Sequence, residues 1–95
     1  MSNKEEFIKT MHSKLDKFNA QIDVLTEKAA KAESSLKEEY KKQLTTLKTK
    51  RDEAEVKLKK LEAASDSAWQ DLKSGVEMAW QSVGEAVDSA SKRFK

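Results

Sequence analysis

The sequence predicts an all-α protein in which a long amphipathic helix folds against a shorter C-terminal helix. Three observations predict this class. Ala, Glu, Lys, Leu and Arg supply 49 of the 95 residues, a share typical of coiled coils and long helices. The chain has no Pro and only two Gly, and its apolar residues recur at helical spacing. We therefore predict an antiparallel coiled coil that is oligomeric, with a three-helix bundle as the alternative arrangement.

Composition and charge exclude several classes of function. Nineteen basic residues nearly balance 17 acidic ones, for a net charge of +2, so the charges do not favour disorder through mutual repulsion. Leu, Ile, Val and Phe total only 18 residues, which leaves a lone chain marginally stable. The lack of Cys excludes disulfides, thiolate catalysis and zinc-thiolate sites. No apolar run suits a secretory signal or a membrane span, so we expect a cytoplasmic protein.

Residues 1–64 are predicted to form a heptad coiled-coil helix. From Ile8 to Leu36 the apolar positions alternate in steps of three and four, which is the pattern of a coiled-coil seam. Two consecutive four-residue steps then shift its phase, as a stutter does. Arg51 falls on the seam, where we expect its stem to lie along the groove and its head to reach water. The predicted interaction residues of this segment are Ile8, Met11, Leu15, Phe18, Ile22, Leu25, Leu36, Tyr40, Leu44, Leu47, Leu58 and Leu61.

A break in this helix is conceivable at residues 33–35. Ser35 and Glu38 have the spacing of a capping box, but Gly, Pro and Asn are absent there and Glu33 to Lys37 is a favourable helical pair. A break produces the three-helix bundle. An unbroken helix over residues 3–63 is about 90 Å long and needs a partner chain for its first half. The two forms use the same contacts, within one chain or swapped between chains, and we expect the unbroken helix.

Residues 65–95 are predicted to form a second amphipathic helix built on an eleven-residue repeat. Residues 66–76, 77–87 and 88–95 align with one another, and Ser67 with Gln70 has capping-box spacing. Eleven residues at about 100° each return to within about 20° of the starting direction. The repeat therefore places one stripe of interaction residues on a single face: Trp69, Leu72, Val76, Trp80, Val83, Val87 and Phe94.

The two Trp residues of the stripe allow two interpretations. Trp69 and Trp80 fill a bundle core with their N–H groups satisfied at its edge, or they lie in a lipid boundary beside Lys73 and the basic C-terminus. Core packing is the interpretation we favour, because the segment carries more acidic than basic residues and anionic lipid attracts it weakly.

The remaining chemistry-bearing residues do not assemble into a predicted catalytic, cofactor or metal site. His12 and Asp16 provide two ligands on one face, too few for a tight metal site. The basic residues between 41 and 51 are distributed around the helix, so no nucleic-acid partner is expected. A nucleophile-elbow motif and a glycine-rich phosphate loop are both absent. We therefore expect no enzymatic activity.

Residues 68–80 read Ala-Trp-x-x-Leu-Lys-x-Gly-Val-x-x-Ala-Trp. With the Lys/Glu-rich stretch before them and the Arg-Phe-Lys end, they resemble a family of short, uncharacterised bacterial coiled-coil proteins, over most of the chain from about Phe7. The resemblance implies an all-helical, non-enzymatic protein without catalytic residues. In periodicity alone, the eleven-residue repeats are also similar to those of exchangeable apolipoproteins and group 3 late-embryogenesis-abundant proteins.

The functional expectation is a structural or interaction protein that acts through self-association or through binding of a partner helix. A homo-oligomer is the expected state, and a helical protein is the other expected partner. The alternative is a reversible lipid- or surface-binding protein of apolipoprotein type, and a third reading is a stress-related hydrophilin.

Overall fold

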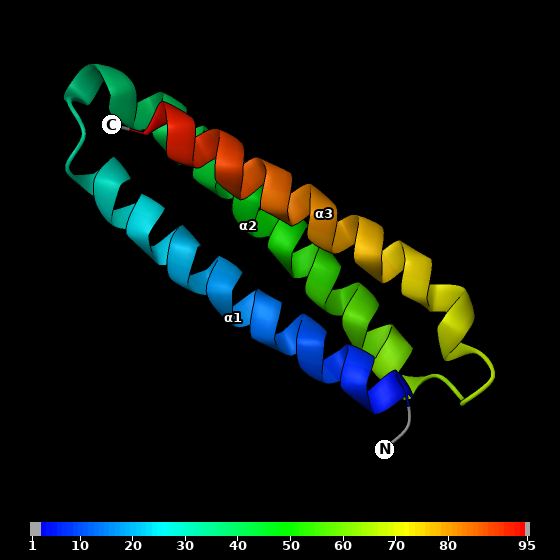
Figure 1. The fold of residues 1–95 in the computed structure, drawn as a ribbon. Helices are drawn as coiled ribbons and strands as arrows, with labels where there is room; N and C mark the ends of the chain where they lie inside the picture. The colour runs from blue at the N-terminus through cyan, green and yellow to red at the C-terminus, as the bar shows by residue number, and fades with distance from the viewer. Residues whose placement is uncertain (1–2, 95) are drawn as a thin grey trace.

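The computed structural model describes residues 3–94 as an elongated three-helix bundle in which each helix runs antiparallel to the one before it, with extents of 51 × 19 × 17 Å (Figure 1). Helix α1 spans Asn3–Ala30, α2 spans Ser34–Ala63 and α3 spans Trp69–Arg93. The all-α class is thus confirmed. Of the two predicted arrangements, the structure has the three-helix bundle.

The expected continuous helix over residues 3–63 is wrong, because α1 ends at Ala30 and α2 begins at Ser34. The Lys31 and Ala32 amides still bond back to the Glu27 and Ala29 carbonyls. Glu33 then turns the chain with an extended backbone at φ −61° and ψ 149°. This turn lets the apolar face of α1 pack within its own chain, so its burial does not require a second molecule.

The capping-box spacings at Ser35 and Ser67 do not mark the observed N-caps. Glu33 is the N-cap of α2 and Ala68 that of α3, and neither makes a side-chain capping bond. Each helix therefore starts one or two residues away from the position that the Ser spacing predicted.

The connection between α2 and α3 is instead held by residues before the predicted cap and by α1. The Ser65 carbonyl accepts hydrogen bonds from the amides of Ala68 and Trp69. From α1, Lys4 Nζ donates to the carbonyl oxygens of Ala64 at 2.6 Å and Glu62 at 3.1 Å. These lysine bonds satisfy two carbonyls at the α2 C-terminus, where the helix leaves such groups unpaired.

A single core runs along the inside of the bundle. It joins the heptad seams of α1 and α2 to the stripe of α3, because each helix has one apolar face and all three faces turn inward. Its buried members are Met11, Leu15, Ile22, Leu25, Tyr40, Leu44, Leu47, Ala54, Leu58, Leu61, Trp69, Val76, Trp80, Val83, Val87, Ala90 and Phe94.

Candidate helix-binding groove

The candidate functional site is the groove between α2 and α3 in which α1 lies, called here the helix groove. Its walls are the inward faces of α2 and α3, and α1 contacts both. The contacts that seat α1 come from Trp69, Trp80 and Gly84 on α3 and from Arg51 and Glu62 on α2.

Trp80 binds the backbone of α1 directly. Its Nε1 donates a hydrogen bond to the Met11 carbonyl oxygen at 3.1 Å, and both residues are buried, with 4% and 5% of their surfaces exposed. A carbonyl oxygen has two lone pairs, so Met11 can accept this bond beside its helical one. Because a buried N–H without an acceptor costs about 1–3 kcal/mol, this bond favours one axial position of α1 over its neighbours.

An aromatic contact fixes the first turns of α1 against the start of α3. The rings of Phe7 and Trp69 lie 6.0 Å apart at an interplanar angle of 38°. Lys73 Nζ lies 5.5 Å from the Phe7 ring centroid and 6.0 Å from that of Trp69, within the range of cation–π attraction. The ammonium group therefore covers the aromatic pair where it meets solvent.

The Phe18 side chain of α1 lies beside Gly84 of α3. A Cβ added at Gly84 would meet the Phe18 ring at 3.7 and 3.8 Å, which is ordinary van der Waals contact. Phe18 is half-buried against the core. The Phe18 ring thus lies close to the α3 backbone, and the site has room for Ala at position 84.

Polar contacts along α2 define the rim of the helix groove. His12 Nε2 and Glu62 Oε1 lie 2.6 Å apart across α1 and α2, with the imidazole 51% exposed. Arg51 donates to Asn19 Oδ1 at 3.3 Å and to its neighbour Asp52 at 3.0 Å, so its head does leave the seam for polar partners. His12 pairs with α2 rather than serving as a ligand with Asp16, and no group of three metal-binding side chains occurs in the part of the chain that the structure describes.

Most of the predicted interaction residues meet in the core around this groove, in the positions the two repeats assigned to them. Ile8, Phe18 and Leu36 are half-buried against the core. Leu72 departs from the rest of the stripe, because 39% of its surface is exposed. Their participation in contacts between molecules stays a prediction.

Sequence reasoning missed one core residue and the closure of one bundle end. Ala90 is buried, and its spacing from Val87 continues the pattern of the stripe, but a small side chain weakens that signal. Ala54, which lies on the heptad seam between Arg51 and Leu58, is buried as well. At the C-terminus of α3 the Tyr40 ring stacks on Phe94 with centroids 4.1 Å apart at 18°. Tyr40 Oη also donates to the Arg93 carbonyl oxygen at 3.1 Å. Because these two residues are 53 positions apart in sequence, no local pattern predicts their contact.

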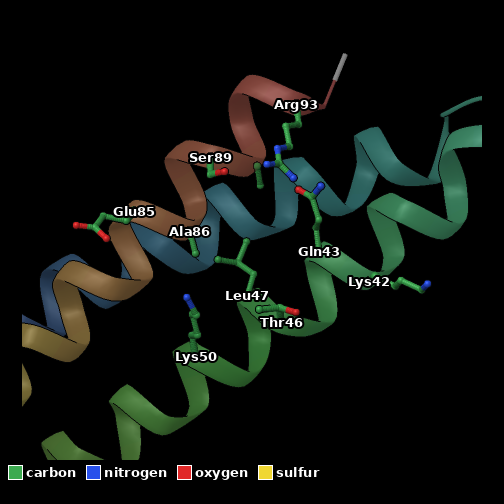
Figure 2. Close-up of a pocket in the computed structure, with 10 residues that line it drawn as sticks. Lys42, Gln43, Thr46, Leu47, Lys50, Glu85, Ala86, Ser89 and Arg93 are labelled. Atoms are coloured by element: carbon green, nitrogen blue, oxygen red, sulfur yellow. The ribbon is translucent and has the colours of Figure 1, made fainter.

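A second, shallow groove of about 390 Å³ lies between α2 and α3 on the side away from α1 (Figure 2). Leu47 and Ala86 form part of its floor, and Lys50 and Glu85 extend along its margin. Gln43 Nε2 is buried there without a hydrogen-bond partner among the described residues. The groove is open to solvent along its length, and its charges are of both signs.

None of the helices in the described part of the chain combines the length and apolarity required to cross a bilayer. Comparison of the chain with protein-family models, with curated proteins and with solved structures finds no match.

Proposed function

We propose that the protein is a non-enzymatic interaction protein whose helix groove binds an amphipathic helix, from a second copy of the chain or from a partner protein. The observation that carries this proposal is the bond from Trp80 to the Met11 backbone carbonyl. This bond supports the proposal, because it holds α1 between α2 and α3 by a contact that a helical ligand in a groove could also make.

The contacts between α1 and the groove do not depend on the covalent link between them. Residues 31–33 connect α1 to α2, and the seating contacts involve side chains and one carbonyl that a separate helix would present equally well. A helix with apolar residues at the spacing of Met11, Leu15, Ile22 and Leu25 presents an apolar face of the same width to the groove.

The rim contacts add orientation to this binding mode. The imidazole of His12 meets the Glu62 carboxylate, and Arg51 meets Asn19, at points well separated along α1. Exposed polar pairs contribute little free energy, but a bound helix that placed like charges opposite one another at the rim would lose more binding free energy than such a pair contributes. The rim therefore favours the antiparallel orientation relative to α2.

Burial of the α3 stripe supports this proposal over the lipid-binding alternative. Trp69 is 6% exposed and Trp80 4%, so both indoles already lie against protein. A lipid-facing role would require both indoles to give up contacts with α1, those of Trp69 with the Phe7 ring and of Trp80 with the Met11 carbonyl. A helix that replaces α1 would restore the same contacts.

Binding in trans tests the proposal. The full chain carrying Ile22→Asp places a carboxylate at a core position that is 1% exposed, which should release α1 from the groove. A fluorescent peptide of residues 3–30 should then bind this variant saturably, as measured by anisotropy, and should shift its Trp emission toward the blue.

Two matched controls make the result specific. The peptide carrying Ile22→Asp should not bind, whereas the peptide carrying Val24→Asp should bind like the wild type, because Val24 is 53% exposed in α1. Failure of the wild-type peptide to bind, or equal binding of both variants, would refute the helix groove as an interaction site.

A further inference from the structure

We infer that a second copy of this chain supplies the helix, and that two copies exchange α1 by straightening residues 31–33 into one continuous helix over residues 3–63. This inference rests on the proposed function, because it names the ligand of the helix groove. It makes the turn between α1 and α2 the hinge of the exchange.

The turn departs from helical geometry at Glu33. Glu33 has φ −61°, which is a helical value, so its ψ of 149° is the angle that must change toward about −42°. No described residue has a positive φ, and no side chain caps the start of α2. Lys31, Ala32 and Glu33 are all good helix formers, so nothing in their chemistry requires the turn.

The apolar pattern passes through the hinge without a change of phase. Ala29, Ala32 and Leu36 continue the alternating steps of three and four from α1 into α2, and all three pack against the core. A continuous helix would therefore keep the seam of residues 8–36 on one face. The phase of the apolar pattern is therefore compatible with a continuous helix through residues 31–33.

The other connection of the bundle has a different construction. Residues 64–68 are held locally by the Ser65 carbonyl, which accepts hydrogen bonds from the Ala68 and Trp69 amides. Helices α2 and α3 also share the buried stripe that contains Val76 and Val83. The hairpin of α2 and α3 therefore stays together while α1 is the element that moves.

Two straightened chains can restore the contacts of the closed bundle between them. Each helix of about 90 Å lies antiparallel to its mate, so that α1 of one copy enters the helix groove of the other. The bond from Trp80 to Met11 and the contact of Glu62 with His12 then form between chains. Since closed monomer and exchanged dimer share these contacts, concentration and the hinge decide between them.

Substitution of Ser34 separates the two states. Ser34 is the first residue of α2, a position that favours Pro, and Glu33 before it is already extended, as a residue preceding Pro must be. Ser34→Pro therefore suits the closed bundle but blocks a continuous helix. Ser34→Ala is the matched control, because it also removes the Ser side chain but keeps the backbone N–H that a continuous helix needs.

Sedimentation equilibrium over a concentration series provides the first measurement. The wild-type chain should form a dimer in increasing proportion with concentration, and Ser34→Ala should follow the wild type. Ser34→Pro should remain monomeric with unchanged helicity by circular dichroism. A Ser34→Pro chain that dimerises like the wild type would overturn the inference, as would a wild-type chain that is monomeric at every concentration.

Cross-linking identifies the chain that supplies α1. The protein has no Cys, so His12→Cys with Glu62→Cys places two unique thiols at adjacent positions of α1 and α2. A short bismaleimide should link them within the monomer and between copies in the isolated dimer. Links confined to single chains in the dimer would overturn the exchange. If the 3–30 peptide still binds in trans, the helix groove stands without exchange; if it does not, both proposals fail.

Discussion

The indole N–H of Trp80 in α3 donates to the backbone carbonyl of Met11 in α1, 69 residues away, across 3.1 Å of the bundle interior. Among the residues that the structure describes, this is the one hydrogen bond from a side chain of α3 to the backbone of α1. It couples the axial position of α1 to α3, while the apolar contacts around it tolerate small shifts.

Replacement of Trp80 by Phe tests this coupling. Trp80→Phe keeps an aromatic ring but removes the N–H, so we expect a loss of about 2–4 kcal/mol in unfolding free energy, from lost packing and the lost bond. Trp69→Phe is the control, because the same ring change there removes no hydrogen bond within the described part of the chain. Urea unfolding followed by circular dichroism should find the Trp80 change more costly by about 1 kcal/mol; an equal or smaller cost would contradict the role of the bond.

Truncation of two neighbouring side chains on α1 should separate core from surface. Ile22→Ala should destabilise the fold by about 2–4 kcal/mol, because it creates a cavity beside the core. Val24→Ala should change stability by about 0.5 kcal/mol or less, since more than half of that side chain is exposed. Thermal unfolding at one fixed protein concentration measures both, and a similar shift for the two variants would argue against the described orientation of α1.

Removal of the Tyr40 hydroxyl should loosen the end of α3. Tyr40→Phe retains the stack on Phe94 but deletes the bond to the Arg93 carbonyl, at an expected cost of about 0.5–1.5 kcal/mol. Amide hydrogen exchange should accelerate in the last turn of α3 and stay unchanged near Trp69. Uniform acceleration over all three helices would show that the bond supports the whole bundle instead of its end.

Tryptophan fluorescence in buffer should show that both indoles are shielded from water. Because both indoles are buried, the emission maximum should already be blue-shifted and should not move when vesicles of anionic phospholipid are added. The Val24→Asp chain serves as a control with an altered surface and an intact core. A blue shift that appears only with lipid would favour the surface-binding alternative over the helix groove.

The sequence by itself determined which residues face inward. Steps of three and four in α1 and α2, and steps of eleven in α3, place side chains on one face of any helix with 3.6 residues per turn. Periodicity of this kind is independent of what covers the face. Leu15, Leu58 and Val83 are therefore buried as their spacing predicts, while Leu72, at the edge of the interface, shows that spacing alone does not set the degree of burial.

Only the tertiary structure decided where the chain turns and which helix covers which face. Lys31, Ala32 and Glu33 suit a helix, and the capping signals at Ser35 and Ser67 are one or two residues away from the observed caps. The local preference for continuing the helix is a small free energy per residue, whereas folding back buries the apolar face of α1 against α2 and α3. The free energy gained by this burial is larger than that of the local helix preference. It depends on contacts between residues such as Met11 and Trp80, which are too far apart in sequence for a local pattern to predict.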